Sequence, residues 1–212
     1  MSLGVTVYII IAKSIKPVVF ITINRVSILI EIIVKKTRVL RPSEYKRLLE
    51  GCQKQDLKTI LQALLYTGMR YIELKRFHKY PSWFDGVQFI HLPREADRKV
   101  KRTQQERFVR LSPPGRIIVG YFLQLKRPMP AYQTWQENMQ TWARRSGLST
   151  GGLCAKTTRK TLESWLMFYY PARAMEIALS QGHTTVTSLQ HYLGMPFNEV
   201  DRIEMKEFIE GW

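Results

Sequence analysis

The sequence predicts a mainly helical domain with a small antiparallel β-sheet, an α+β fold, from three observations. Apolar residues recur every three or four positions in several stretches between residues 42 and 182, the spacing of amphipathic helices. Two short stretches, 86–92 and 106–111, alternate apolar and polar residues as strands do. The chain has 212 residues, of which 45% are hydrophobic, enough for the core of one sizeable domain.

The first predicted helix starts at Pro42, with Ser43 as a possible N-cap. A second helix is predicted over residues 56–66, where leucine and isoleucine repeat at helical spacing. Gly68 ends this helix, because glycine readily adopts the left-handed conformation that follows a helix. Arg70 then begins the next helical turn, with its guanidinium directed outward from a rigid core.

The strands 86–92 and 106–111 are joined by a basic stretch, and two helices follow them at 113–125 and 131–146. The apolar side of the first of these helices is predicted to comprise Ile117, Ile118, Tyr121 and Phe122. The second carries Trp135, Met139 and Trp142 on one stripe. Tryptophans at this spacing are typical of a core and not of a surface that stacks on bases.

Gly151-Gly152 predicts a turn, after which a helix carries Lys156 and Arg159 three residues apart. A short helix from Pro171 is predicted to end in Gly182, which turns the chain and presents His183.

The N-terminal residues 1–37 are rich in Val, Ile and Thr, which favours strands, and charged residues and Pro17 interrupt their apolar runs. No run reaches the roughly 18 residues of a membrane span, so no membrane association is predicted. This segment is interpreted as linker-like with an unassigned role, and residues 35–38 as a basic linker. Residues 196–212 are predicted to form a C-terminal tail helix.

The charge of the chain favours a nucleic-acid partner. Lysine and arginine number 33 against 17 acidic residues, which leaves a net charge of +16 and a pI near 10.0. A membrane surface or a merely soluble cationic protein would fit the charge as well. Cys52 and Cys154 are too few for a disulfide framework and lack metal-ligand spacing, so a reducing compartment is expected.

Five residues could together attack a phosphodiester. The cations Arg70, Lys156 and Arg159 would hold the phosphate and stabilise its developing charge, with help from the imidazole of His183. The phenol of Tyr192 would be the nucleophile. The structural alternatives are ordinary helix-surface ion pairs, of Arg70 with the nearby Glu73 and of Arg159 with Glu163, which contribute little at a surface.

These residues carry a resemblance to a known family. The stretch Tyr66-Thr-Gly-Met-Arg70-Tyr-Ile-Glu73-Leu74 resembles the first arginine box of the tyrosine recombinases, the phage-integrase family. Lys156-x-x-Arg159, Gly182-His183 and Tyr192 follow in that family's order, although the family more often has His-x-x-Arg. Among its subfamilies, the chain is most similar to the integrases of archaeal spindle-shaped viruses (fuselloviruses).

The resemblance covers roughly residues 38–195, which would form the tyrosine-recombinase catalytic domain. It implies cleavage and rejoining of duplex DNA through a 3′-phosphotyrosyl link, without a metal ion, ATP or any other cofactor. It also implies that a lysine between the two strands protonates the leaving 5′-oxygen. Lys99 and Lys101 both fit that role, and the alternative for either is a contact with backbone phosphates.

Further DNA contacts are predicted for Arg98 and Arg102 beside these lysines and for Arg144 and Arg145 at the end of the helix 131–146. The resemblance also implies a tetramer on DNA, which the tail could hold together by docking on a neighbouring protomer. The apolar face for this docking would be Met205, Phe208, Ile209 and Trp212. Packing of that face on the chain's own domain is the alternative.

The segment before residue 38 is neither long nor helical enough to be the DNA-clamping domain of the family. The chain is therefore expected to be a catalytic fragment or a truncated gene product, and to bind DNA weakly and with little sequence preference. Its expected location is the cytoplasm of a host cell, on DNA. The leading hypothesis is an integrase that inserts viral or mobile DNA. A type IB topoisomerase-like nicking-closing enzyme and a non-catalytic DNA-binding regulator are the alternatives.

Overall fold

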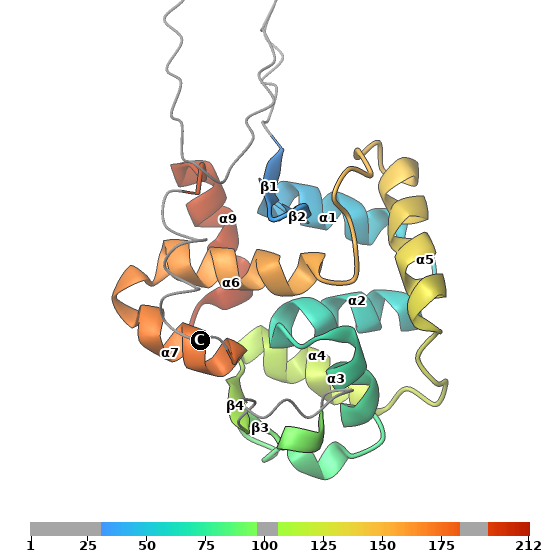
Figure 1. Cartoon of the computed structure of the whole chain (residues 1–212), viewed down its shortest axis with the longest axis vertical. Helices are drawn as coiled ribbons and strands as arrows, with labels where there is room; N and C mark the ends of the chain where they lie inside the picture. Colours follow the sequence, from blue (N-terminus) through green and yellow to red (C-terminus); the bar gives the residue numbers. More distant parts are fainter. Residues whose placement is uncertain (1–30, 97–105, 183–194) are drawn as a thin grey trace, which may run out of the picture.

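The computed structural model of the chain describes residues 31–96, 106–182 and 195–212. It is mainly helical with two small antiparallel sheets, which confirms the predicted fold class (Figure 1). In chain order the elements are β1 (Ile32–Val34), β2 (Thr37–Val39), α1 (Pro42–Gly51), α2 (Gln55–Thr67), α3 (Tyr71–Phe77), β3 (Phe89–Leu92), β4 (Arg107–Arg110), α4 (Pro113–Leu123), α5 (Tyr132–Arg145), α6 (Thr157–Tyr169), α7 (Ala174–Gln181) and α9 (Glu199–Ile209). Short 3-10 turns occupy Pro81–Trp83, Arg94–Ala96 and Pro171–Arg173.

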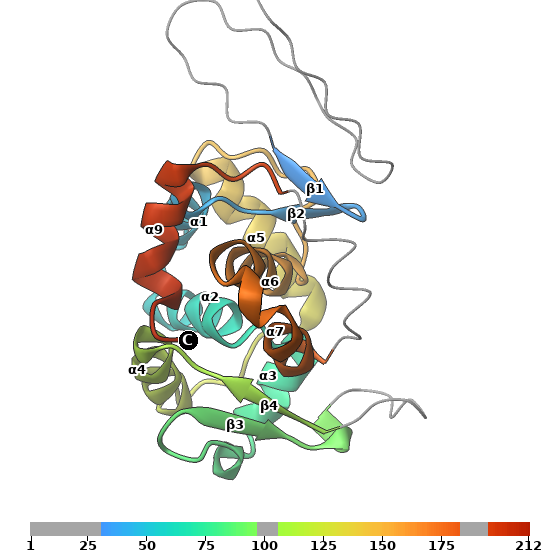
Figure 2. The same ribbon diagram turned by 90° about the vertical axis from the view of Figure 1, so that its left-hand side faces the viewer.

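Helix α6 runs through the middle of the domain. The β1–β2 hairpin and α1 lie on one side of it, and α2 lies on the other, followed by α3, α4 and the β3–β4 hairpin (Figures 1 and 2). Helix α6 packs against β2, α2, α7 and α9. Its central residues Leu162, Trp165 and Leu166 are buried, as the sequence pattern predicted. The core therefore forms around this one helix.

The N-terminal hairpin corrects the interpretation of residues 35–38 as a linker. Ile32 pairs with Val39 in an antiparallel register, and the side chains of Ile32, Val34 and Val39 belong to the core. Lys35 and Lys36 form the tight turn, with φ of 45° and 63°. Such angles are unusual outside glycine, so a tight turn at two lysines was not expected from the sequence. Residues 1–30 lie outside the described part of the chain.

The start of α1 differs from the prediction that Ser43 is its N-cap. Arg41 is the N-cap, and Pro42 takes the first helical position, where its fixed φ is already helical. The Glu44 carboxylate accepts hydrogen bonds from the Arg41 main-chain NH at 2.9 Å and from the Arg38 guanidinium at 2.6 Å. This acidic residue in the first turn therefore satisfies the helix start that Ser43 was expected to satisfy.

Helix α4 buries only part of the predicted face, since Phe122 is buried and Ile118 packs against the core but the other two predicted residues do not. Ile117 and Tyr121 are 61% and 58% exposed, whereas Val119 and Phe122 are fully buried. Gly115 is also buried and lets α4 approach Tyr66 of α2 closely, so packing on α2 and not local hydrophobicity selects the face. The predicted stripe of α5 is confirmed, since its two tryptophans and Met139 are buried.

The tail forms α9, which packs on its own domain against α1, α4 and α6 (Figure 2). Its apolar residues Met205, Phe208, Ile209 and Trp212 are buried. The buried Asp201 forms an ion pair with Arg41, and the Ser112 hydroxyl donates to the Phe208 main-chain oxygen at 2.8 Å. The alternative of packing within the chain is thus the arrangement seen here, and docking on a neighbouring protomer stays a prediction.

Both cysteines are free thiols, Cys52 buried and Cys154 half-buried. Burial raises the pKa of Cys52 to about 11, so this thiol is neutral at pH 7. Among the helices described, none is both long and apolar enough to cross a membrane.

Candidate active site

The site begins where α2 ends. Gly68 takes the left-handed conformation, with φ of 59°, and the chain turns directly into α3 with Arg70 as its N-cap. The Glu73 carboxylate accepts hydrogen bonds from the Arg70 main-chain NH at 2.7 Å and from the Arg70 guanidinium at 2.6 Å. The ion pair offered as the alternative for Arg70 is therefore formed. It does not bury Arg70, whose side chain is 38% exposed.

Arg159 approaches the same place from the first turn of α6. Its guanidinium donates from Nη1 to the main-chain oxygen of Gly68 at 2.7 Å and from Nη2 to the main-chain oxygen of Gln181. Both acceptors lie at helix C-termini, whose carbonyls carry partial negative charge. Gly182 ends α7 in the left-handed conformation, with φ of 66°, as predicted. Arg159 thus joins the ends of α2 and α7.

A third arginine, which the sequence analysis missed, completes the cluster. Arg107 on β4 is 7% exposed and donates from Nη2 to the Glu73 carboxylate at 2.7 Å. Its Nε donates to the Ser180 main-chain oxygen at 3.2 Å. The alternation of β4 could have revealed it, since Arg107 shares the buried face of the strand with Val109. We call Arg70, Arg107, Arg159 and Glu73 the arginine cluster.

The charges in the arginine cluster shift one another's pKa values. Burial raises the pKa of Glu73, but the charge and hydrogen bond of Arg107, with the other two guanidiniums, lower it to about 2. Burial lowers the pKa of Arg159 to about 10, against the opposing effect of Glu73. Glu73 and Arg159 are therefore both ionised at pH 7. Three arginines surround Glu73, and the buried Glu163 is a second negative charge that acts on Arg159, so a smaller excess of positive charge remains where Arg70 reaches the surface.

The other predicted cations lie apart from this cluster or outside the described residues. Lys156 is the N-cap of α6 and is exposed, whereas Arg159 is buried, although the two lie three residues apart. Arg144 and Arg145 are exposed at the end of α5, where they donate to Thr141 and Gln53. Six further predicted residues lie in the ranges that the structure does not describe: Arg98, Lys99, Lys101, Arg102, His183 and Tyr192.

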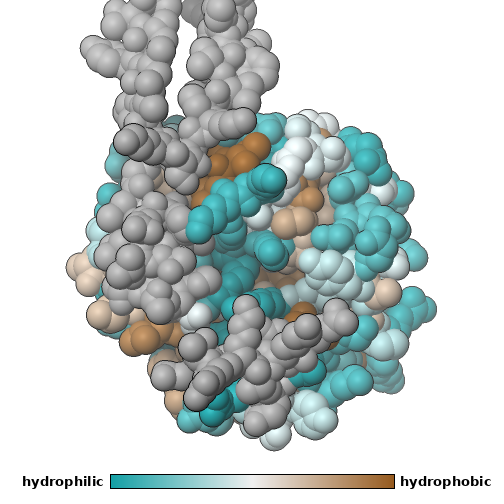
Figure 3. Space-filling view, viewed as in Figure 1, coloured by the Kyte–Doolittle hydropathy of each residue, from teal (hydrophilic) through white to brown (hydrophobic). Residues whose placement is uncertain are grey.

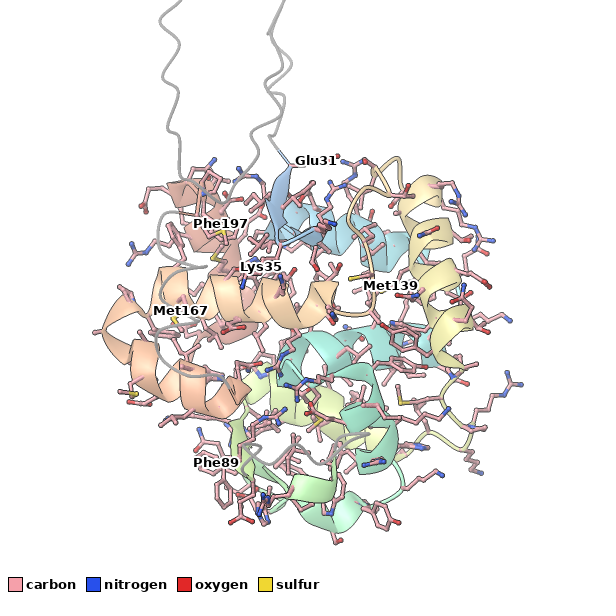
Figure 4. The ribbon with its side chains drawn as sticks, viewed as in Figure 1. Glu31, Lys35, Phe89, Met139, Met167 and Phe197 are labelled. Carbon is pink, nitrogen blue, oxygen red and sulfur yellow. The ribbon has the colours of Figure 1, made fainter. Side chains whose placement is uncertain are left out.

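The turn of the first hairpin adds basic residues beside α6. Lys160 donates to the Val34 main-chain oxygen at 2.8 Å and so fixes the hairpin to the helix. Burial lowers the pKa of Lys160, and the charges of Lys35 and Lys156 lower it further. Figure 4 shows Lys35 in front of α6, and in Figure 3 hydrophilic residues spread across the middle of this face. We call Lys35, Lys36, Lys156 and Lys160 the lysine surface.

Within the described ranges, no group of three or more His, Cys, Asp or Glu side chains is placed to hold a metal ion. The expectation that no metal or other cofactor takes part stays a prediction.

The arrangement of helices around two small hairpins is the fold of a tyrosine-recombinase catalytic domain. It matches the crystal structure of XerA recombinase with a TM-score of 0.57 and 18% sequence identity. The match covers 80% of this chain and 64% of the XerA chain, so this chain spans less than two thirds of that protein. No family model and no curated protein matches the sequence. At this identity the likeness establishes the fold, and the activity is a separate question.

Proposed function

We propose that this chain is the catalytic domain of a site-specific DNA recombinase that cleaves and rejoins duplex DNA through a 3′-phosphotyrosyl intermediate. The observation that carries the proposal is the arginine cluster, in which three parts of the chain, α3, β4 and α6, place three guanidiniums around one buried carboxylate. The fold shared with XerA recombinase supports it.

The arginine cluster is suited to bind an anion. A buried or half-buried excess of positive charge costs free energy unless a negative group approaches it. The planar guanidinium of Arg70 suits two oxygens of one phosphate. Burial lowers the pKa of Arg159, and the charges of Arg107 and Arg70 lower it further against the opposing effect of Glu73 and Glu163. A phosphodiester carries one negative charge and gains more in the transition state, so the cluster would stabilise that state most.

In the proposed reaction the phenol oxygen of Tyr192 attacks the scissile phosphorus, and the bond from phosphorus to the 5′-oxygen breaks. The phenol proton leaves as the new bond forms, and Lys99 or Lys101 gives a proton to the departing 5′-oxygen. His183 would hydrogen bond to the phosphate. Attack by another 5′-hydroxyl on the phosphotyrosyl link reverses these steps and joins a new partner, so the bond energy is retained without ATP.

The proposed partner is duplex DNA, which the net charge of +16 and the lysine surface would attract. Strand exchange between two duplexes requires several copies of the chain, so we propose a tetramer on DNA. Transfer of α9 to a neighbouring copy is one way to hold it together. The biological outcome we propose is integration of viral or mobile DNA, as the resemblance of the sequence boxes to archaeal virus integrases suggests.

The test is capture of the covalent intermediate on a duplex that carries a nick next to the cleavage position, so that the released fragment diffuses away. A protein–DNA adduct is expected for the wild type and none for Tyr192→Phe. Tyr80→Phe is a matched control, since Tyr80 is 54% exposed and stacks on Trp83 away from the cluster.

If no tested duplex forms an adduct, the recombinase proposal fails, and a DNA-binding regulator is the function that remains. Adducts and supercoil relaxation without transfer between two duplexes would indicate a topoisomerase-like enzyme instead. An adduct that persists in Tyr192→Phe would remove Tyr192 from its proposed role.

A further inference from the structure

We propose that Arg107 is a positioning residue of the arginine cluster, which holds Glu73 and the end of α7 so that Arg70 and Arg159 face one phosphate. This inference rests on the proposed function and adds a residue that neither the sequence boxes nor the reaction chemistry required.

The two oxygens of Glu73 show the first half of this role. One oxygen accepts from the guanidinium of Arg70 at 2.6 Å, and the other accepts from Arg107 at 2.7 Å. Glu73 is completely buried and Arg107 nearly so, whereas Arg70 reaches the surface. Arg107 therefore balances the carboxylate from inside the protein. Glu73 holds Arg70 in place, but because the same carboxylate also pairs with Arg107, it does not fully balance the charge of Arg70.

The opposite side of Arg107 shows the second half. Its Nε donates to the Ser180 main-chain oxygen at 3.2 Å, one residue before the Gln181 oxygen that accepts from Arg159. Its side chain also lies against Gly182, where an added Cβ would stand 3.0 Å from the Arg107 Cδ. Arg107 thus fixes the last turn of α7, and with it the acceptor of Arg159.

A lysine could not make both contacts. The two bonds of Arg107 leave from different nitrogens of one rigid planar group and end on two elements, α3 and α7. A lysine has a single nitrogen at the end of a flexible chain, so it could balance Glu73 but would leave the Ser180 oxygen without this donor. A neutral side chain would leave Glu73 to pair with Arg70 alone.

Arg107 also links the cluster to the hairpin. It is the first residue of β4, into which residues 97–105 lead, and these residues contain Lys99 and Lys101. Any role of either lysine as the general acid depends on where β4 lies relative to the phosphate. The contacts of Arg107 with Glu73 and Ser180 join this end of β4 to α3 and α7.

The experiment compares Arg107→Met and Arg107→Lys with Arg116→Met, which removes the same charge from an exposed position on α4. Adduct formation is measured in single turnover with saturating nicked duplex, together with the Kd for DNA and the melting temperature. Arg107→Met is expected to form adduct about 100-fold more slowly, as misplaced catalytic groups do. Its Kd should stay within about threefold, since Arg107 is nearly buried and the phosphate contacts are made by other cations. Arg107→Lys should recover part of the rate, and Arg116→Met should resemble the wild type.

A second readout separates positioning from mere loss of folding. Glu73 is surrounded by Arg70 from α3, Arg107 from β4 and Arg159 from α6. Removing Arg107 leaves burial less opposed, so the pKa of Glu73 rises. The rate of adduct formation should therefore begin to fall at a higher pH in Arg107→Met than in the wild type. In Arg107→Lys this pH should return toward the wild-type value.

The outcomes are distinguishable. If the wild type forms no adduct, the proposed function fails before Arg107 is tested. If it does, a folded Arg107→Met protein that reacts at the wild-type rate overturns the inference. The inference is also overturned if the unfolded fraction of Arg107→Met accounts for its whole loss of rate and the pH at which the adduct rate falls in acid is the same as in the wild type.

Discussion

The guanidinium of Arg159 donates a 2.7 Å hydrogen bond to the main-chain oxygen of Gly68, 91 positions earlier in the chain. This contact exists because α2 stops at a glycine and leaves its last carbonyls without partners within the helix. The Gln181 oxygen at the end of α7 is the second acceptor. Two helix C-termini thus provide the partial negative charge that allows a cation to be buried at this point. The site lies where helices end, and glycines set those ends.

Gly182→Ala should impair the site more than the fold. Gly182 has φ of 66°, which costs an alanine about 1 kcal/mol, and the new Cβ would stand 3.0 Å from Arg107. We expect a small fall in melting temperature and a fall of about 10-fold or more in adduct formation, because Arg107 must shift. Gly120→Ala is the control, since Gly120 lies within α4 with nothing within 4 Å of an added Cβ. It should stabilise the protein by up to about 1 kcal/mol. Equal rates in the two variants would contradict the link from Gly182 to Arg107.

Acid should weaken the fold through Glu73. The folded-state pKa of Glu73 is about 2, below its ordinary value of 4.5, so ionised Glu73 stabilises the folded state. That contribution is complete above the ordinary value and is lost as the pH falls from about 4.5 toward 2. The loss corresponds to about 3 kcal/mol for this residue. Urea unfolding at pH 3 to 6 measures it, and Glu73→Gln should flatten this part of the pH profile. An equally steep profile in Glu73→Gln would assign the acid sensitivity to other carboxylates.

Asp201→Asn should destabilise the domain strongly. Asp201 and Arg41 form a buried ion pair between α9 and the start of α1, and removing one charge leaves the other uncompensated. The expected cost is about 3 to 5 kcal/mol in urea unfolding. Glu207→Gln is the matched control on the same helix, because its pair with Lys46 is exposed, and its cost should be below about 1 kcal/mol. Similar costs for the two variants would show that burial does not distinguish these ion pairs.

Substitutions in the lysine surface should alter the salt dependence of DNA binding. Lys156→Gln removes one exposed charge of the lysine surface, so the slope of log K against log salt should fall by about 1. Filter binding or fluorescence anisotropy between about 50 and 200 mM salt covers the range in which this effect is large. Lys79→Gln, exposed just beyond α3, is the control and should leave the slope unchanged. If both variants change it equally, the contacts with DNA are spread over the whole basic surface.

Much of the fold was predictable because local signals and tertiary packing agree. Helical periodicity located α1, α2, α5, α6 and α9, and glycine marked the ends of α2 and α7. The face of α4 was predicted only in part: Phe122 is buried as expected, but Ile117 is exposed and Val119, which is locally as hydrophobic, is buried in its place. Only the approach of α2, which depends on distant residues, decides between the two faces.

Part of the site was predictable because its residues occur in short boxes with fixed spacing. The pairing of Arg70 with Glu73 is local, and the sequence showed it. The convergence of Arg70 and Arg159 followed from the resemblance to tyrosine recombinases. Arg107 was missed because its partners lie 34 and 73 positions away, and an arginine in a strand ordinarily faces solvent. A buried arginine is recognised only when the carboxylate that it pairs with is known.

The turn of the first hairpin has a consequence for attempts to engineer the domain. Lys35 and Lys36 hold left-handed angles that Asn and Gly adopt at much lower cost, and each strained residue costs on the order of 1 kcal/mol. Replacing the pair by Asn-Gly should therefore give a more thermostable protein. The same replacement would remove two charges from the side of the domain proposed to meet DNA. We infer that thermal stability and DNA affinity oppose each other at this turn. A variant selected for thermal stability alone would therefore bind DNA less tightly.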